Sequence, residues 1–253
     1  MTVLDDRPTT PGARGSREVI LQLDRVSKTY ASGALEVHAL RDVSLTISRG
    51  EYVSIVGPSG SGKSTMMNIL GCLDIATAGS YMLGGVDVEE MDETQLAEVR
   101  NRQIGFVFQQ FNLLPSLTAL RNVELPLCYA GLRKDLRRER AREALGRVGL
   151  ADRVDHRPNE LSGGQQQRVA VARALVGDPT LILADEPTGN LDSHSTADVL
   201  ALLAELHAAG RTIVLITHEP AVAASAERTI HVRDGRIFAD EVPGRPEPGR
   251  ESG

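Results

Sequence analysis

The sequence predicts an α/β protein built on a mostly parallel β-sheet. Short apolar strands alternate with helices along much of the chain, and this alternation favours parallel strand pairing. The first two strands show period-two alternation, which predicts an antiparallel β subdomain. A long stretch with helical spacing in the middle of the chain predicts a helical subdomain inserted between strands.

The composition is typical of a globular protein. The chain has 253 residues, of which 41% are hydrophobic and 25% are charged, and this length suits one large domain or two small ones. The net charge of −6 argues against nucleic acid as a partner, because no overall basic field would attract it. Cys72 and Cys128 lie far apart without a paired motif, so we interpret them as free thiols in a reducing compartment.

The hydrophobic runs and the composition of the two ends indicate where the folded domain begins and ends. No apolar run approaches the ~18 residues that a membrane-spanning helix needs, and the N-terminus lacks the apolar core of a signal peptide. We therefore expect a cytoplasmic protein that reaches a membrane only through a partner. Residues 1–17 and 243–253 are rich in Pro, Gly and polar residues and are expected to be disordered. The folded domain is expected to span residues 18–242.

The first part of the domain alternates between strands and one helix. Residues 20–30 and 35–47 alternate apolar and polar side chains and predict antiparallel strands around a Ser-Gly turn. Residues 51–56 form an apolar run typical of a buried strand, and residues 64–70 have the pattern of a helix. Residues 81–88 contain a Gly-Gly pair and predict a short strand with a turn.

The middle of the chain is predicted to be largely helical. Residues 93–102 are predicted as a helix and residues 104–108 as a strand. From Asn112 the spacing becomes helical, and the inserted helical subdomain is expected to cover about residues 110–165. Acidic residues interleave the basic run of residues 133–142 at helical spacing, which indicates a solvated helix face. A nucleic-acid patch is the alternative, but no aromatic residues accompany the basic ones.

The last part of the domain resumes the alternation and ends in a hairpin around Asp234-Gly235. Its predicted elements are a strand at residues 180–184, a helix at 195–209, a strand at 212–217 and hairpin strands at 228–232 and 236–239.

The segment GPSGSGKST has the spacing of a phosphate-binding loop. Glycines let successive backbone N–H groups point into one anion site, the lysine reaches terminal phosphates and the serine hydroxyl can ligate Mg²⁺. The flanking strand and helix are the context that this motif requires, and a solvated Gly/Ser surface turn is the alternative. The loop comprises Gly57, Pro58, Ser59, Gly60, Ser61, Gly62, Lys63, Ser64 and Thr65.

Two further motifs point to the same chemistry. An apolar strand ends in Asp185 and Glu186, where an aspartate beside a phosphate loop can hold Mg²⁺ through water and a glutamate can orient or deprotonate an attacking water. Ser162, Gly163 and Gly164 look like a helix start with a serine cap and two glycines that let a second anion approach. An ordinary capped helix accounts for the serine but gives no reason for two glycines in the first turn.

The complete set of motifs resembles that of an ATP-binding cassette (ABC) ATPase over residues 18–242. The phosphate loop, GFVFQQ, LSGGQ, LILADE, GNLD and LITHE occur in the order and spacing of that family. NILGCLD, GFVFQQFNLLPSLTALRNVELPL and ADEPTGNLD are typical of its lipoprotein-release, macrolide-export and FtsE-like branch. The resemblance implies a P-loop NTPase (RecA-like) core, bound ATP and Mg²⁺, and hydrolysis of ATP to ADP and phosphate.

The resemblance also implies roles for individual residues. Glu186 matches the catalytic base, His218 the histidine at the γ-phosphate, and Gln109 the glutamine that contacts Mg²⁺ and the attacking water. Gln110 is the neighbouring alternative to Gln109. Tyr30 matches the aromatic residue that stacks on adenine, with a strand aromatic in a small core as the alternative. The implied Mg²⁺ ligands are Ser64, Gln109 and Asp185, and the ATP-binding set adds Ser162, Gly163, Gly164, Gln165 and Asp192 to the phosphate loop and Tyr30.

The resemblance implies two kinds of partner. A second copy of the chain would bring its Ser162–Gly164 helix start over the ATP that the phosphate loop holds, and Asp192 would link the two sites. An integral membrane permease on a separate chain would dock on residues 112–131, although apolar residues there could equally be core. The protein would then sit on the inner face of the cell membrane. An FtsE-like role in controlling a cell-wall hydrolase is the alternative function, and a soluble repair or translation ATPase ranks far behind, because no long coiled coil follows the phosphate loop.

Overall fold

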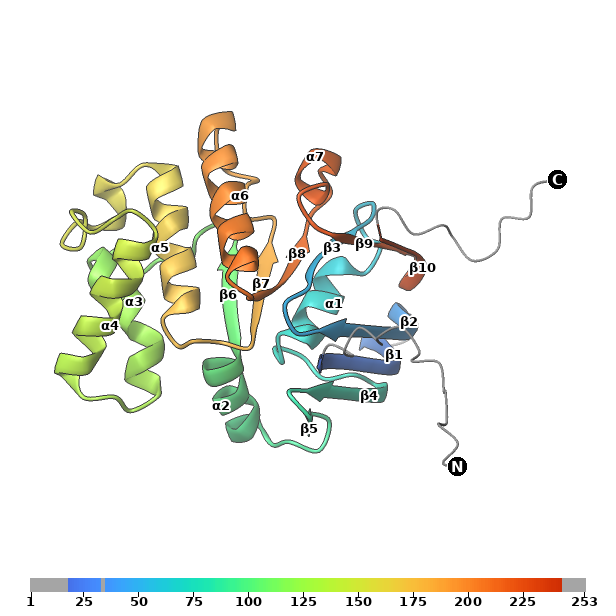
Figure 1. Ribbon diagram of the computed structural model, residues 1–253. Helices are drawn as coiled ribbons and strands as arrows, with labels where there is room; N and C mark the ends of the chain where they lie inside the picture. Colours follow the sequence, from blue (N-terminus) through green and yellow to red (C-terminus); the bar gives the residue numbers. More distant parts are fainter. Residues whose placement is uncertain (1–17, 33–34, 243–253) are drawn as a thin grey trace, which may run out of the picture.

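The computed structural model describes residues 18–32 and 35–242. The predicted disordered ends, residues 1–17 and 243–253, and part of the predicted Ser-Gly turn at residues 33–34 lie outside the described residues. A central sheet lies between a helical subdomain and a second, antiparallel sheet (Figure 1). This arrangement confirms the predicted combination of a parallel core, an antiparallel β subdomain and an inserted helical subdomain.

The core sheet has six strands in the order β10-β9-β3-β8-β7-β6. Five of them run parallel, and β10 pairs antiparallel with β9 at one edge. Every residue of β8 is buried, as expected for a strand covered by helices on both faces. The strands are β3 (Tyr52–Val56), β6 (Ile104–Phe108), β7 (Leu181–Asp185), β8 (Thr212–Ile216), β9 (Arg228–Arg233) and β10 (Arg236–Glu241).

The second sheet is antiparallel and shares its hydrophobic core with helix α1 (Lys63–Leu70). Its order is β2-β1-β4-β5, with β1 (Val19–Ser32), β2 (Leu35–Ser48), β4 (Ala78–Leu83) and β5 (Val86–Asp87). Met66, Met67, Ile69 and Leu70 of α1 are buried in the core between the two sheets. The helix that follows the phosphate loop is therefore anchored along its apolar face.

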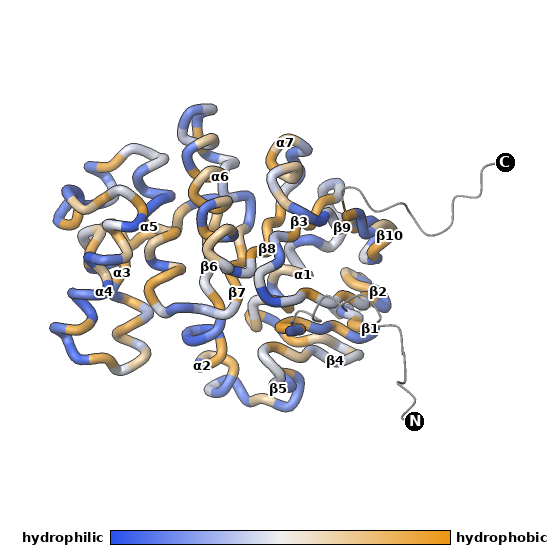
Figure 2. Tube along the Cα trace, in the orientation of Figure 1, coloured by the Kyte–Doolittle hydropathy of each residue, from blue (hydrophilic) through white to orange (hydrophobic). Residues whose placement is uncertain are grey.

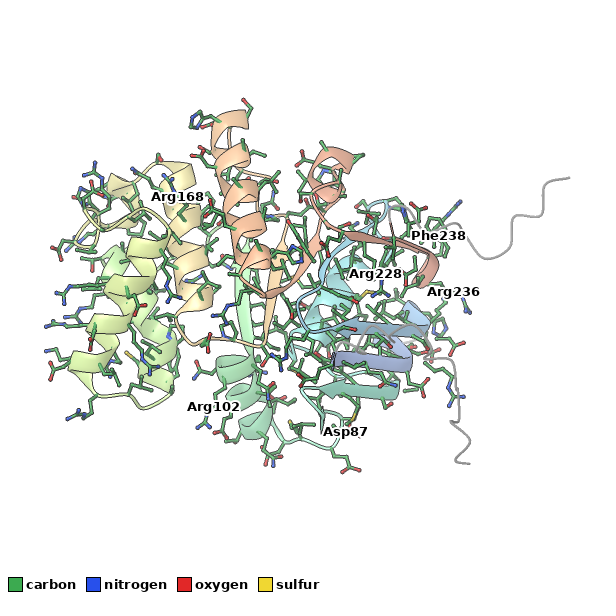
Figure 3. All side chains as sticks on the ribbon, viewed as in Figure 1. Asp87, Arg102, Arg168, Arg228, Arg236 and Phe238 are labelled. Atoms are coloured by element: carbon green, nitrogen blue, oxygen red, sulfur yellow. The ribbon has the colours of Figure 1, made fainter. Side chains whose placement is uncertain are left out.

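Arg228 connects the two sheets close to their junction (Figure 3). Its guanidinium donates to both carboxylate oxygens of Asp240 at 2.7 Å, to Glu51 at 2.9 Å and to the backbone carbonyl of Thr46 at 2.9 Å. The hydrogen bond to Asp240 raises the pKa of Arg228 even though burial opposes the charge. The fork thus joins β9 and β10 to the end of β2 and the start of β3.

The helices cover the faces of the core sheet, and α3, α4 and α5 gather into a separate subdomain (Figure 1). Figure 2 shows that hydrophobic residues concentrate in the central strands, whereas α4 is largely hydrophilic. An exposed ion pair joins Arg147 to Glu143 one turn away at 2.8 Å, which agrees with the predicted solvated helix face. The helices are α2 (Glu93–Gln103), α3 (Ala119–Tyr129), α4 (Lys134–Arg147), α5 (Gly163–Leu175), α6 (Ser193–Ala208), α7 (Pro220–Ala223) and the 3₁₀ turn η1 (Pro158–Glu160).

The prediction of helix from Asn112 onward is wrong for residues 112–118. Helix α3 begins only at Ala119, and Thr118 caps it by accepting from the N–H of Arg121 at 3.2 Å. The buried amide of Asn122 holds the preceding loop instead: its Oδ1 accepts from the N–H of Leu114 at 2.7 Å, and its Nδ2 lies 3.0–3.2 Å from the carbonyls of Leu114, Leu117 and Thr118. One side chain therefore satisfies backbone groups that a helix would have paired. The short helix α7 and the turn η1 were not predicted.

Replacing Asn122 with leucine should destabilise the helical subdomain. Asn122→Leu keeps the size of the side chain but leaves several buried carbonyls and one N–H without a partner, so we expect a loss of about 1–3 kcal/mol in the free energy of unfolding. Urea denaturation followed by circular dichroism measures this loss. Arg121→Ala, at the exposed neighbouring position, is the control, and equal midpoints for both variants would contradict the role given to Asn122.

Candidate functional site

The register of the core sheet brings four strand ends to one edge. Phe108 lies opposite Asp185, Asp185 opposite Ile216, and Ile55 also opposite Ile216. Because these strands are parallel, the residues that follow them leave the sheet on the same side. The phosphate loop after β3, Gln109 after β6, Glu186 after β7 and His218 after β8 are gathered in this way.

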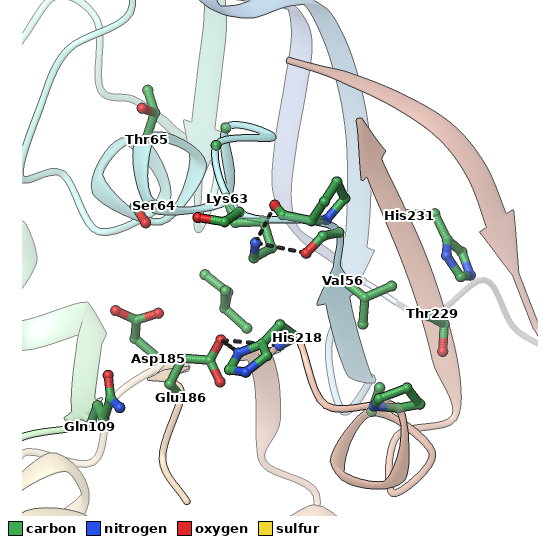
Figure 4. A pocket seen from close by; sticks show the side chains of 18 of the residues that line it. Val56, Lys63, Ser64, Thr65, Gln109, Asp185, Glu186, His218, Thr229 and His231 are labelled. Atoms are coloured by element: carbon green, nitrogen blue, oxygen red, sulfur yellow. Dashed lines mark hydrogen bonds and ion pairs between the residues drawn. The ribbon is translucent and has the colours of Figure 1, made fainter. Parts of the chain in front are cut away.

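A cavity of about 1180 Å³ opens at this edge. Figure 4 shows Lys63, Gln109, Asp185, Glu186 and His218 around it. Gln110 is not among the residues that line it, so of the two neighbouring glutamines only Gln109 reaches the site. The predicted residues that line the cavity are Gly57, Pro58, Ser59, Gly60, Gly62, Lys63, Ser64, Thr65, Gln109, Asp185, Glu186 and His218.

The phosphate loop has the backbone of an anion site. Gly60 and Gly62 have φ values of 77° and 105°, which a residue with a Cβ adopts only at a cost. Among the described residues, no side chain caps α1 at Gly62, so the first N–H groups of this helix have no capping acceptor. Lys63 bends back over the loop, and its Nζ donates to the carbonyls of Gly57 at 2.8 Å and Pro58 at 2.9 Å. The loop therefore offers free donors and a cation to a negatively charged ligand.

The β9–β10 hairpin supports this loop from behind. The N–H of Gly235 in the hairpin turn donates to the carbonyl of Ser61 at 2.9 Å. A Cβ on Gly57 would collide with the carbonyl oxygen of Val232 in β9. The hairpin predicted around Asp234-Gly235 is thus part of the site's scaffold, a role that the sequence did not indicate.

Two acidic residues stand on the side of the cavity opposite the loop. Burial raises the pKa of Asp185, the charge of Glu186 adds to this rise, and Lys63 opposes it. Glu186 is only 15% exposed and has a φ of 44°, an unusual conformation for a residue with a side chain. Two adjacent carboxylates thus face a single lysine across the cavity.

Glu186 is held in place by the end of β8. Its Oε2 accepts from the hydroxyl of Thr217 at 3.1 Å. Its Oε1 accepts from the backbone N–H of His218 at 3.1 Å and from the Nδ1 of the same residue at 2.6 Å. The hydrogen bond and the charge of Glu186 raise the pKa of His218. The carboxylate is therefore oriented by three donors before any ligand binds.

The donor set at this edge fits Mg²⁺. Ser64 presents an exposed hydroxyl in the first turn of α1, and Asp185 lies on the facing side of the cavity in Figure 4. Within residues 18–32 and 35–242, no cluster of three or more His, Cys, Asp or Glu residues could cage a metal by itself. Mg²⁺ commonly takes one or two protein oxygens and completes its shell with water and phosphate oxygens, which agrees with this sparse set.

The LSGGQ segment lies apart from the cavity. Ser162 caps α5 by accepting from the N–H of Gln165 at 3.2 Å, and the side chain of Gln165 accepts from the N–H of Ser162 at 2.9 Å. Asp192 caps α6, accepting from the N–H of Ser195 at 2.8 Å, and this hydrogen bond lowers its pKa. The described residues that line the cavity do not include Ser162, Gly163, Gly164, Gln165 or Asp192.

The two glycines of LSGGQ, Gly163 and Gly164, have different surroundings. A Cβ on Gly164 would come within 2.7 Å of the Ser195 hydroxyl, so this glycine allows α5 and α6 to approach each other closely. A Cβ on Gly163 would meet no atom nearer than 3.5 Å. Gly163 leaves room beside the start of the helix, whereas Gly164 is also needed for packing inside the subunit.

Tyr30 is an exposed strand residue and does not line the cavity. It is 40% exposed, which contradicts the alternative of an aromatic residue in a small core. Its hydroxyl donates to Asp74 at 2.7 Å.

Several residues at the site were missed by the sequence analysis. Ala39 of β2, Thr229 and His231 of β9 and Glu241 of β10 also line the cavity. They come from three separate segments and carry no motif, so only the folded chain brings them together. Thr217 lies within LITHE, but its bond to Glu186 could not be read from the sequence.

A parallel sheet with a phosphate loop on one strand and paired acids on another defines a P-loop nucleoside triphosphatase. The sequence profile of the ABC transporter family matches residues 40–189. The chain therefore belongs to the ABC transporter family as an ATP-binding cassette, and it is an ATPase.

Known relatives agree with this assignment. The chain is 56% identical over 222 residues to the uncharacterized ABC transporter ATP-binding protein YvrO of Bacillus subtilis, covering 88% of this chain and 97% of YvrO. It is 56% identical over 221 residues to the macrolide export ATP-binding/permease protein MacB 1 of Yersinia pestis bv. Antiqua, covering 87% of this chain. The chain spans only 34% of the length of that MacB protein.

Solved structures with the same fold include the cassette MJ0796. Its dimeric post-hydrolysis state bound to ADP and Pi matches with a TM-score of 0.81 and 47% identity, covering 88% of this chain and 98% of that chain. A second dimeric structure of MJ0796 matches with the same TM-score and 48% identity.

The contact between Glu186 and His218 predicts a measurable pKa. In an NMR titration, the His218 ring should titrate above the ordinary histidine value of 6.5, and Glu186→Gln should lower its pKa because the anionic acceptor is lost. The pair stabilises the fold below the ordinary pKa, and this contribution is lost as pH rises through the raised pKa of His218. Glu219→Gln removes a weaker nearby charge and is the control. A His218 pKa that Glu186→Gln does not lower would contradict the contact.

Proposed function

We propose that the cavity at the strand ends binds ATP with Mg²⁺ and that Glu186 activates the water that attacks the γ-phosphate. The observation that carries this proposal is the pairing of opposite charges across the cavity. On one side lie the free N–H groups of α1 and the Lys63 ammonium. On the other lie Asp185 and a Glu186 carboxylate oriented by Thr217 and His218.

Each residue has a role that follows from its position. Lys63 exchanges the carbonyls of Gly57 and Pro58 for phosphate oxygens, and the turns at Gly60 and Gly62 direct backbone N–H groups at the same phosphates. Ser64, Asp185 and Gln109 are the candidate Mg²⁺ ligands, and the bound ion would neutralise charge on the phosphates.

Glu186, the proposed base, takes the proton of the water, and His218 contacts the γ-phosphate. The remaining ATP-binding residue is Tyr30, whose ring stacks on adenine. Its exposed ring stands at the end of β1, outside the phosphate cavity, where a base extending from the phosphates would meet it.

We infer that a second copy of the cassette completes each site. The MJ0796 relatives are dimers, and the side chains of Ser162 and Asp192 are exposed here, away from the subunit's own cavity. Gly163 leaves the start of α5 open. The helix start formed by Ser162, Gly163, Gly164 and Gln165 would close over the γ-phosphate held by the other subunit. Asp192 would link the two sites.

We further propose that the ATPase drives a membrane permease that docks between the core and the helical subdomain. A groove of about 790 Å³ is lined by α2, β6, α3 and α5. Phe106 and Phe108 stack 5.4 Å apart on its floor, and Tyr129 at its rim is 78% exposed. An apolar groove next to an exposed aromatic residue suits an amphipathic helix. None of the helices in residues 18–32 and 35–242 is long and apolar enough to cross a bilayer.

The permease would place this chain on the inner face of the cell membrane. The macrolide export relatives are named as combined ATP-binding and permease proteins. Docking of this kind serves export or an FtsE-like control of a cell-wall hydrolase equally, so the identity of the membrane partner decides between them.

Replacing the proposed base should separate ATP binding from hydrolysis. Glu186→Gln should lower turnover by about 10²–10⁴-fold, because the amide cannot accept the proton of water. ATP should then hold two subunits together, which size-exclusion chromatography with light scattering detects.

A second substitution tests the closing of the site. Ser162→Asp in the Glu186→Gln background keeps a helix cap but adds a negative charge beside the γ-phosphate. It should abolish the ATP-dependent dimer and leave nucleotide affinity of the monomer unchanged, whereas the neutral cap Ser162→Asn serves as the control. A dimer that survives Ser162→Asp would count against the proposed closure.

The groove should retain a membrane protein. Affinity purification from detergent-solubilised membranes with the Glu186→Gln variant and ATP should capture an integral membrane protein, identified by mass spectrometry. Tyr129→Asp places a charge at the rim of the groove and should reduce this capture, while ATP affinity stays the same. Equal capture by both variants would place the docking surface elsewhere.

A further inference from the structure

A half-buried ion pair contacts Tyr30 on two sides. The ammonium of Lys28 lies 5.0 Å from the centroid of the Tyr30 ring and 2.6 Å from Asp74 Oδ1. The Tyr30 hydroxyl donates to the other oxygen of the same carboxylate at 2.7 Å. Lys28 and Tyr30 are two residues apart on β1 and therefore point to the same face of the strand. The three side chains form a closed triangle of contacts.

The backbone of Asp74 is bonded to the phosphate-loop helix. Asp74 lies four residues after the end of α1, and its N–H donates to the carbonyl of Asn68 in that helix at 3.2 Å. The N–H of Ile75 donates to Asp74 Oδ1 at 2.8 Å, and Lys28 also donates to the Ile75 carbonyl at 2.7 Å. Burial opposes the charge of Asp74, but the hydrogen bonds from Lys28 and Tyr30 lower its pKa.

The same cluster sets the ring relative to the phosphate loop. The side chain of Thr65, which lines the phosphate cavity, lies beside the Tyr30 hydroxyl. Lys28 and Asp74 are mostly buried, with side chains 13% and 28% exposed, whereas Tyr30 is 40% exposed. One side of the ring is thus occupied by the ammonium, and its hydroxyl is bonded, while part of the ring remains open to solvent.

We propose that Lys28 and Asp74 are positioning residues that hold the Tyr30 ring ready for the adenine base. The inference rests on the proposed stacking of Tyr30 on adenine. An exposed tyrosine on a strand otherwise samples several rotamers, and a ligand that binds it must fix one of them. Here the ion pair fixes the ring before nucleotide arrives, at a set distance from the loop that grips the phosphates.

We expect a modest gain in affinity, limited to ligands that carry the adenine base. Fixing one side chain in advance is worth about three- to tenfold in affinity. A purely structural pair between β1 and the end of α1 would instead disturb the phosphate loop and weaken every ligand of the site. The ratio of affinities for a ligand with the base and a ligand without it therefore separates the two roles.

The test compares ADP with pyrophosphate by isothermal titration calorimetry, so that no hydrolysis occurs. Tyr30→Phe, Lys28→Met and Asp74→Leu should each weaken ADP binding by about three- to tenfold and leave pyrophosphate binding unchanged. Tyr30→Phe should add nothing in the Asp74→Leu background, because both remove the same bond. Arg49→Met breaks another ion pair at the edge of the same sheet, to Glu18 at 2.7 Å, and is the control.

The outcomes separate this inference from the proposed stacking. If Tyr30→Ala leaves ADP binding intact, adenine does not stack on Tyr30, and both proposals fail. If Tyr30→Ala weakens ADP binding but Tyr30→Phe and Lys28→Met do not, the stacking stands and the positioning role is overturned. Equal weakening of ADP and pyrophosphate binding would assign the pair a structural role only. Should Asp74→Leu fail to fold, Tyr30→Phe and Lys28→Met still decide the matter, since both keep Asp74.

Discussion

The backbone of the phosphate loop is the constraint on which the rest of the fold depends. An anion site made of N–H groups requires donors that no other part of the protein satisfies, and such groups are costly to bury. The chain resolves this by leaving α1 uncapped at Gly62 and by packing the loop against backbone from elsewhere. Gly62 faces the carbonyl of Ala39, Gly57 faces that of Val232, and Gly235 donates to Ser61. The loop is therefore held by β2, which lies shortly before it in the chain, and by the β9–β10 hairpin, which lies far from it in sequence.

The register of the core sheet, and not local structure, positions the two carboxylates that face the phosphate loop. Asp185 and Glu186 end β7, while the donors that orient Glu186 come from the end of β8. A shift of one residue between these strands would separate the carboxylate from Thr217 and His218. The left-handed backbone of Glu186, with a φ of 44°, is tolerated because its N–H donates to Ile216 at 2.8 Å and its carbonyl accepts from Gly189 at 3.1 Å.

Helix α5 joins the nucleotide site to the proposed docking groove. The side chain of its Gln167 donates to the carbonyls of Phe108 and Pro187. Phe108 ends β6 just before Gln109, and Pro187 follows Glu186 after β7. Arg173 of α5 lines the groove and donates to the carbonyls of Phe111 at 2.9 Å and Asn112 at 2.5 Å, both in left-handed conformations. Burial lowers the pKa of Arg173, and the two carbonyls accept from its partly buried guanidinium. Side chains of α5 therefore contact both the strand ends at the cavity and the segment beside the groove.

The sequence by itself determined most of the elements and the chemistry of the motifs, because both depend on residues close together in the chain. The strand at residues 104–108, the serine cap of α5 and the uncapped glycine loop all follow from local patterns. Only the tertiary structure decided what depends on distant segments. It placed Gln109 and not Gln110 in the cavity, and it packed Gly164 against α6. Residues 112–118, predicted as helix, form a loop that Asn122 holds. The tertiary structure also brought Lys28 and Asp74 together around Tyr30, 44 residues before Asp74, a contact that no local pattern encodes.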